Sequence, residues 1–205
     1  MEYRTLKQYA QTELIERRSR FIATAAPVAD RDEAEAFVAE LRARYRDATH
    51  NCFAYIISSG EMRASDDGEP SGTAGTPMLE VLKKEGLVKA AVVVTRYFGG
   101  VLLGAGGLVR AYGASAKAGV DAAGIVTMAP CRCFDVEMDY GDAQRVGVLI
   151  AASEAVLSDT VYTDKVRFCM YIRDEFYNDF VARLTDAVGG RLLVTQTGSR
   201  YCAVQ

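Results

Sequence analysis

The last third of the chain changes its hydrophobic period in an order that few folds accommodate. Apolar residues recur at every second position in some segments and at helical spacing in others. The periods fit a strand, a helix, two strands, a helix and a strand over residues 131–140, 142–153, 155–163, 165–173, 174–188 and 191–204. Asp174 is the expected cap of the second helix. This β-α-β-β-α-β order predicts a ferredoxin-like domain.

The preceding residues follow a different pattern, and Pro130 marks the expected boundary between two domains, 1–129 and 130–205. Residues 13–23 suit two short strands or one bent strand. Asp30 with Glu33 forms a capping box that begins a helix. We expect further strands at 51–58 and 90–97, a short helix that Thr76 caps, and a long helix ending near residue 122. The fold class is therefore α+β with two domains.

Composition limits the kinds of protein this chain can be. It has 205 residues and a net charge of -3, and residues 1–129 carry as many acidic as basic side chains. A strongly basic, non-specific nucleic-acid binder is disfavoured, so a nucleic-acid contact would need a local patch. The start of the chain does not read as a signal peptide, and its apolar stretches are too short to span a bilayer. Five cysteines do not suggest a disulfide framework, and we expect a soluble cytoplasmic protein.

The loop from Ser65 to Pro77 carries an unusual density of polar and turn-forming residues. The candidate surface residues in it are Asp66, Asp67, Glu69, Ser71, Thr73 and Thr76. Three close carboxylates could hold Mg²⁺ or Ca²⁺, although the EF-hand spacing is absent. A backbone nest at a helix N-terminus could instead receive an anion. The third interpretation is a loop whose Asp and Ser side chains bond their own backbone.

A glycine-rich segment leads from the 90–97 strand into the long helix. Its candidate residues are Arg96, Tyr97, Gly99, Gly100, Gly106, Gly107 and Arg110. Strand-to-helix glycine loops often hold phosphates, but neither the P-loop nor the dinucleotide spacing is present. The arginines could meet a phosphate or a carboxylate. Alternatively, the glycines and the small residues Ala111, Ala114, Ser115 and Ala118 let the helix pack closely against a sheet, while Arg96 and Arg110 pair with acidic side chains.

The single histidine and the cysteines give weaker signals. His50 and Cys52 share one side of a strand, so a Cys–His pair is conceivable, but a buried thiol beside a structural histidine is favoured. Cys131, Cys133, Cys169 and Cys202 lie on strands of the second domain, where packing is favoured over metal binding. We therefore expect no bound metal and no cofactor.

Several of these segments together resemble the signature of the YigZ/IMPACT family. They are Ser19-Arg20-Phe21, His50-Asn51-Cys52, the run from Asp66 to Gly75 with Pro77, the run from Val93 to Gly100, and the run from Leu103 to Tyr112. The resemblance covers nearly the whole chain. It implies an α/β sandwich for residues 1 to about 128, similar to the second domain of a small-subunit ribosomal protein. It also implies a second domain similar to late domains of elongation factor G.

The resemblance implies a role but transfers no catalytic residue. Eukaryotic members bind the activator of the amino-acid-starvation kinase, whereas the bacterial architecture suggests a translation-linked or nucleic-acid-linked role. We expect a non-enzymatic regulatory binding protein that contacts RNA, the ribosome or a translation-associated protein through the two loops. In this hypothesis Arg96 and Arg110 contact phosphate or an acidic partner. The alternative is a metal-dependent hydrolase or phosphotransfer enzyme using Asp66, Asp67 and Glu69. A third hypothesis is a structural partner protein that acts through the ferredoxin-like sheet.

Overall fold

The computed structural model describes residues 1–204 and divides them into two compact units, residues 3–127, and residues 1–2 with 128–204. The strands are β1 (Tyr3–Leu6), β2 (Ala10–Glu16), β3 (Ser19–Pro27), β4 (His50–Ser58), β5 (Glu61–Ser65), β6 (Ala90–Tyr97), β7 (Ile125–Met138), β8 (Val156–Tyr162), β9 (Val166–Arg173) and β10 (Leu192–Val204). The helices are α1 (Arg31–Arg44), α2 (Gly75–Lys84), α3 (Ala105–Ala123), α4 (Tyr140–Ala151) and α5 (Tyr177–Ala187). The expectation of a two-domain α+β fold is confirmed.

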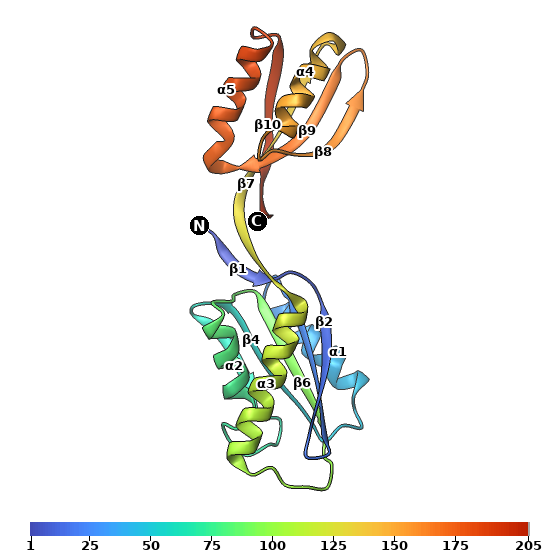
Figure 1. The fold of residues 1–205 in the computed structure, drawn as a ribbon, viewed down its shortest axis with the longest axis vertical. Helices are drawn as coiled ribbons and strands as arrows, with labels where there is room; N and C mark the ends of the chain where they lie inside the picture. The colour runs from blue at the N-terminus through green and yellow to red at the C-terminus, as the bar shows by residue number, and fades with distance from the viewer. Residues whose placement is uncertain (205) are drawn as a thin grey trace. The chain divides into compact units, whose positions relative to one another are not determined.

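The N-terminal unit is built on one antiparallel sheet in the order β2-β3-β6-β4-β5. Helices α2 and α3 cover one face of this sheet and α1 covers the other (Figure 1). The central strand β6 is buried on both faces, which explains its nearly unbroken valine-rich sequence. Helix α1 begins where the capping box predicts, because the Asp30 side chain accepts a hydrogen bond from the N–H of Glu33.

Helix α3 packs closely on the sheet because its buried face is made of small residues. A Cβ atom at Gly119 would lie 3.2 Å from the Cβ of Ala23 on β3. Of the four small residues expected on this face, Ala111 and Ser115 are buried, whereas Ala114 is exposed and Ala118 is half-buried. Gly106 and Gly107, expected in a flexible connection, belong to the first turn of this helix.

Strands β2 and β3 form a hairpin, so residues 13–23 give two strands rather than one bent strand. Glu16 pairs with Ser19, which leaves a two-residue turn made of Arg17 and Arg18. Both arginines have positive φ, at 45° and 68°. Such turns favour Asn or Gly, because a side chain is strained in the left-handed region.

The C-terminal unit has the predicted element order. Strands β10, β7, β9 and β8 are neighbours in that order, which is the arrangement 4-1-3-2 of a βαββαβ unit. Helices α4 and α5 cover one face of this sheet (Figure 1). Among residues 1–204, no helix combines the length and the apolar character needed to cross a membrane.

The two units divide between Thr127 and Met128, close to the boundary expected at Pro130. Pro130 itself lies within β7, just before Cys131, the first residue that pairs with β9. One local prediction in this region is wrong. Asp174 does not cap α5; it begins a short 3₁₀ turn and binds Arg132 at 2.6 Å.

Candidate functional site

The loop between β5 and α2 is organised by one carboxylate. Asp66 Oδ1 accepts hydrogen bonds from the N–H groups of Ala74 and Gly75 at 3.0 and 2.8 Å, and Oδ2 accepts one from Gly72 at 2.8 Å. Burial alone would raise the pKa of Asp66, but these three bonds outweigh it and hold the pKa below its usual value. The prediction that Thr76 caps α2 is therefore wrong. Thr76 lies inside the helix, and the capping side chain is that of Asp66, eight positions before the N-cap residue Ala74.

The second carboxylate of the loop fastens it to its neighbours. Asp67 Oδ1 binds Arg42 of α1 at 2.5 Å, and Oδ2 accepts the N–H of Asn51 at 2.7 Å. The backbone carbonyl of Asp67 accepts a hydrogen bond from His50 Nδ1 at 2.8 Å. No cluster of three metal-ligating side chains is found in residues 1–204. Asp66 and Asp67 thus bind different protein groups and do not converge on one point. This agrees best with the third interpretation, in which side chains of the loop hold its own backbone.

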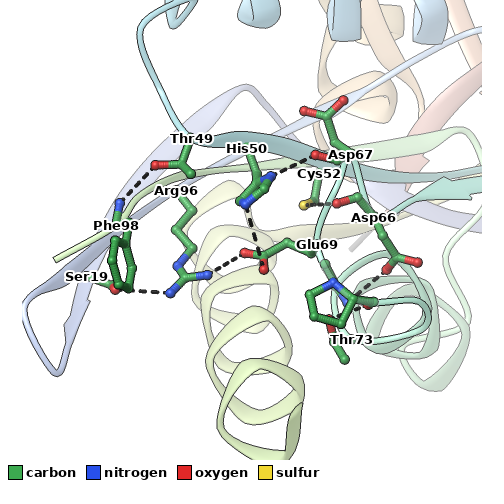
Figure 2. A network of polar contacts seen from close by, with 12 residues as sticks. Ser19, Thr49, His50, Cys52, Asp66, Asp67, Glu69, Thr73, Arg96 and Phe98 are labelled. Carbon is green, nitrogen blue, oxygen red and sulfur yellow. Dashed lines mark hydrogen bonds and ion pairs between the residues drawn. The ribbon is translucent and has the colours of Figure 1, made fainter. Parts of the chain in front are cut away.

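Glu69 forms a buried ion pair with Arg96 of β6, so the two predicted loops meet in space (Figure 2). Arg96 Nη1 lies 2.6 Å from Glu69 Oε1, and the same oxygen accepts a hydrogen bond from the Tyr112 hydroxyl at 2.7 Å. Arg96 Nη2 donates to Ser19 Oγ at 3.3 Å. Only 6% of the Arg96 side chain and 3% of the Glu69 side chain are exposed. Arg96 is therefore part of the internal framework, as in the alternative in which the arginines pair with acidic side chains, and is not open to a phosphate in this structure.

Cys52 lies beneath this network and is fully buried. Its Sγ lies 3.0 Å from the carbonyl oxygen of Asp66 and 3.4 Å from the Tyr112 hydroxyl. Burial raises the pKa of the Cys52 thiol to about 12 and also raises the pKa of Tyr112. A protonated, inaccessible thiol is not a nucleophile, which favours the structural interpretation of the His50 and Cys52 pair.

The loop after β6 is held against the β2–β3 hairpin. The N–H of Gly99 donates to Ser19 Oγ at 3.2 Å, and the N–H of Phe98 donates to Thr49 Oγ1 at 3.0 Å. A Cβ atom at Gly99 would lie 2.1 Å from the carbonyl carbon of Arg18, so only glycine fits this position.

A cavity of about 380 Å³ opens beside this network. His50, Glu69 and Arg96 contribute polar groups to its wall, and Phe98 and Leu102 contribute apolar surface. Figure 2 shows His50, Glu69 and Arg96 pointing toward one another above α3. His50 Nε2 lies 3.8 Å from Glu69 Oε2. The size is within the range of small-molecule and nucleotide sites.

A second hollow of about 240 Å³ lies at the start of α3, and Leu103 lines both cavities. Arg17 and Arg110 line this hollow together with Gly107, and Arg18 follows Arg17 in the hairpin turn. These three arginines are exposed and have no ion-pair or hydrogen-bond partner for their side chains within residues 1–204. Helix α3 has no side-chain cap, and its N-cap Gly104 and first residue Ala105 line the larger cavity, whereas Gly107 and Arg110 line this hollow.

The remaining predicted residues have mixed surroundings. Thr73 is buried and donates to the Pro70 carbonyl at 2.6 Å, whereas Ser71 and Thr76 are exposed. The Tyr97 hydroxyl donates to Asp47 at 3.0 Å. Gly100 has a φ of 80° and open space around it. Arg17 and Arg18 were missed as site candidates, although two arginines between two strand patterns are a sequence signal for an exposed turn.

Family comparisons agree with this two-unit architecture. The Impact N-terminal domain matches residues 17–120, and the Domain of unknown function (DUF1949) matches residues 136–191. IMPACT family member YvyE of Bacillus subtilis is 39% identical over 191 residues, covering 92% of this chain and 88% of the relative. IMPACT family member YigZ of Escherichia coli is 33% identical over 180 residues, covering 86% and 88%.

More distant and structural relatives give the same result. Protein IMPACT of Rattus norvegicus is 35% identical over 98 residues, which cover 44% of this chain and 30% of that protein. A solved structure described as a hypothetical protein matches with a TM-score of 0.62 at 30% identity, covering 94% of this chain and 96% of that one. Because the family domain matches half of the chain and the Bacillus subtilis and Escherichia coli relatives are 39% and 33% identical over most of it, the chain belongs to the IMPACT family.

Proposed function

We propose that this protein is a translation-linked binding protein that contacts RNA, free or within the ribosome, through the arginine cluster formed by Arg17, Arg18 and Arg110. The observation that carries the proposal is that these three exposed guanidinium groups lack partners of their own. Most other arginines of the N-terminal unit are paired with a carboxylate, as in Arg20 with Glu13. A phosphodiester group supplies the missing acceptors.

The start of α3 adds to the attraction for an anion. Its first turn contains Gly106 and Gly107, is not capped by a side chain, and lies beside Arg110. The positive end of the helix dipole and the free N–H groups favour a phosphate oxygen there. The neutral charge balance of residues 1–129 means that this attraction is local, so only a few phosphates are contacted.

The backbone of the hairpin turn supports a binding role for its arginines. Arg17 and Arg18 both adopt the left-handed conformation, which is unfavourable for residues with side chains. Strained positions tend to occur where a side chain has a task other than folding. Here the turn projects two long cationic side chains beside the hollow that Arg17 lines.

The proposal is tested by measuring binding to ribosomes and to deproteinised ribosomal RNA across a salt series. The variants are Arg110→Ala and the double variant Arg17→Ala/Arg18→Ala. The matched control is Arg183→Ala, an exposed arginine of the C-terminal unit that also lacks a partner within residues 1–204. Affinity is expected to fall with salt, and each lost phosphate contact lowers the slope by about 0.7 for single-stranded RNA.

Two outcomes refute the proposal. One is that the wild-type protein binds neither ribosomes nor RNA at low salt. The other is that the cluster variants bind with the same affinity and salt slope as the Arg183 variant. Binding to intact ribosomes but not to deproteinised RNA restricts the proposed contact to RNA as folded within the ribosome, and loss of the dependence on Arg110 and on salt there would reject the RNA contact.

A further inference from the structure

The 380 Å³ cavity beside the arginine cluster presents two hydrogen-bond acceptors that no residue satisfies. Glu69 Oε1 accepts bonds from Arg96 and Tyr112, but within residues 1–204 Glu69 Oε2 has only His50 Nε2 near it, at 3.8 Å. That separation is too long for a hydrogen bond. The Glu69 side chain is 97% buried, and its Oε2 is an acceptor without a hydrogen-bond partner at the wall of the cavity.

The hydrogen bond that Nδ1 makes determines whether Nε2 of His50 donates or accepts. Its Nδ1 lies 2.8 Å from the carbonyl oxygen of Asp67, and a carbonyl oxygen only accepts. When the ring is neutral, its proton is therefore on Nδ1, and Nε2 is an acceptor. In that tautomer Glu69 Oε2 and His50 Nε2 can both accept hydrogen bonds from one group with two N–H donors.

The charge balance around these acceptors selects a neutral donor. The carboxylate of Glu69 is already compensated by the guanidinium of Arg96 at 2.6 Å. A ligand ammonium group would add an uncompensated charge inside this partly buried site. A neutral amino group supplies the two N–H donors without that penalty.

The apolar part of the cavity wall suits a flat ring: Phe98 lies beside Arg96, whose guanidinium carbon is 5.5 Å from the centre of the Phe98 ring, and the rest of the ring is open. Phe98 is 46% exposed and Leu102 is 81% exposed, although both are large apolar residues. An exposed phenylalanine beside a polar cavity is a stacking platform for a base. Leu103 lies between this cavity and the hollow of the arginine cluster, so a base and its phosphate can occupy adjacent sites.

We propose that the cavity binds an unstacked nucleobase with an exocyclic amino group, which donates to Glu69 Oε2 and His50 Nε2 while the ring stacks on Phe98. The inference rests on the proposed RNA contact for its phosphate. Adenine, cytosine and guanine carry the amino group and uracil does not. A uracil would turn a carbonyl oxygen toward the two acceptors, so it is rejected by repulsion as well as by a missing bond.

The test compares the RNA pentamers of adenosine and uridine, and the free mononucleotides AMP and UMP, by fluorescence anisotropy and calorimetry at one salt concentration. The wild-type protein is expected to bind the adenosine pentamer and AMP about tenfold more tightly than the uridine pentamer and UMP. The variant His50→Phe keeps a ring of similar size but removes the acceptor, and should reduce this ratio to below about twofold. Circular dichroism and thermal unfolding verify that it is folded.

A second variant keeps the test valid if the His50 substitution disturbs the fold. Phe98→Ala truncates a half-exposed ring and should weaken binding of the adenosine pentamer about tenfold. Val148→Ala, which truncates an exposed apolar side chain of the C-terminal unit, is the control and should leave binding unchanged.

The possible results separate the base site from the RNA contact. RNA binding that depends on Arg110 but does not distinguish adenosine from uridine overturns the base site and leaves the proposed function standing. AMP binding that depends on His50, without any RNA binding, supports the base site and rejects the RNA contact. Failure of both RNA and mononucleotides to bind overturns both.

Discussion

Removing one partner of the buried pair between Arg96 and Glu69 should destabilise the N-terminal unit strongly. In Arg96→Met the Glu69 carboxylate, 97% buried in the wild-type protein, loses its 2.6 Å contact with the guanidinium; among residues 1–204 the Tyr112 hydroxyl is then the one donor left to it. An uncompensated buried charge costs about 3–5 kcal/mol. The double variant Arg96→Met/Glu69→Gln removes both charges and keeps an acceptor for Tyr112. Its cost should be at least about 2 kcal/mol less than the sum of the two single variants.

The measurement must report on the N-terminal unit alone, since two units need not unfold together. Hydrogen exchange of the amides of β6, read by mass spectrometry over a urea series, gives the opening free energy of the sheet that contains Arg96. Arg31→Ala breaks an exposed pair with Glu35 and should leave that free energy nearly unchanged. A loss below about 1 kcal/mol in Arg96→Met, or additive losses in the double variant, would refute the reasoning.

Three further outcomes follow from single contacts. Gly99→Ala should lower the free energy of unfolding, measured by thermal unfolding, by about 2 kcal/mol or more, because its Cβ would lie 2.1 Å from the carbonyl carbon of Arg18. Gly147→Ala in helix α4, where the Cβ would meet open space, should instead stabilise the protein by about 0.5–1 kcal/mol. Cys52 should resist iodoacetamide at pH 8 in the folded protein, since a pKa of about 12 leaves about one thiolate in ten thousand; rapid modification of its peptide in mass spectrometry would contradict this. Asp66→Asn should cost about 0.5–2 kcal/mol at pH 7 through the weakened cap of α2. Because the pKa of Asp66 is lowered in the folded protein, the stabilisation by its carboxylate is present above the ordinary carboxyl pKa and is lost as the pH falls through the folded pKa. The unfolding curves of the wild-type protein and Asp66→Asn should therefore converge in acid.

The sequence predicts the elements well where the local pattern determines them. Strand β6 was expected at 90–97 and lies there, because a buried strand needs an unbroken apolar run whatever surrounds it. The start of α1 follows from Asp30 and Glu33, whose side chains act within one turn. Asp174 is not the cap of α5 because its side chain binds Arg132, 42 positions away, a partner that the local pattern does not identify.

The candidate site was harder to predict because its contacts join residues far apart in the chain. Glu69 and Arg96 are 27 positions apart, and their pairing depends on β4 and β6 lying side by side, with His50 opposite Arg96. The family motif marked both residues, but residue type alone could not separate a buried framework arginine from an exposed contact. The cap of α2 was assigned to Thr76 for the same reason, since Asp66 reaches it through the folded loop.

If the proposed RNA contact holds, the strained turn of Arg17 and Arg18 sets the stability of the hairpin against its binding at two adjacent positions. An Asn-Gly pair suits the turn conformation far better and would make the hairpin more stable. Selection of variants for heat resistance alone would then replace these arginines, and under the proposed contact the most thermostable variants would be those that bind phosphate less tightly. The unfavourable dipeptide would thus be a trade-off between stability and activity.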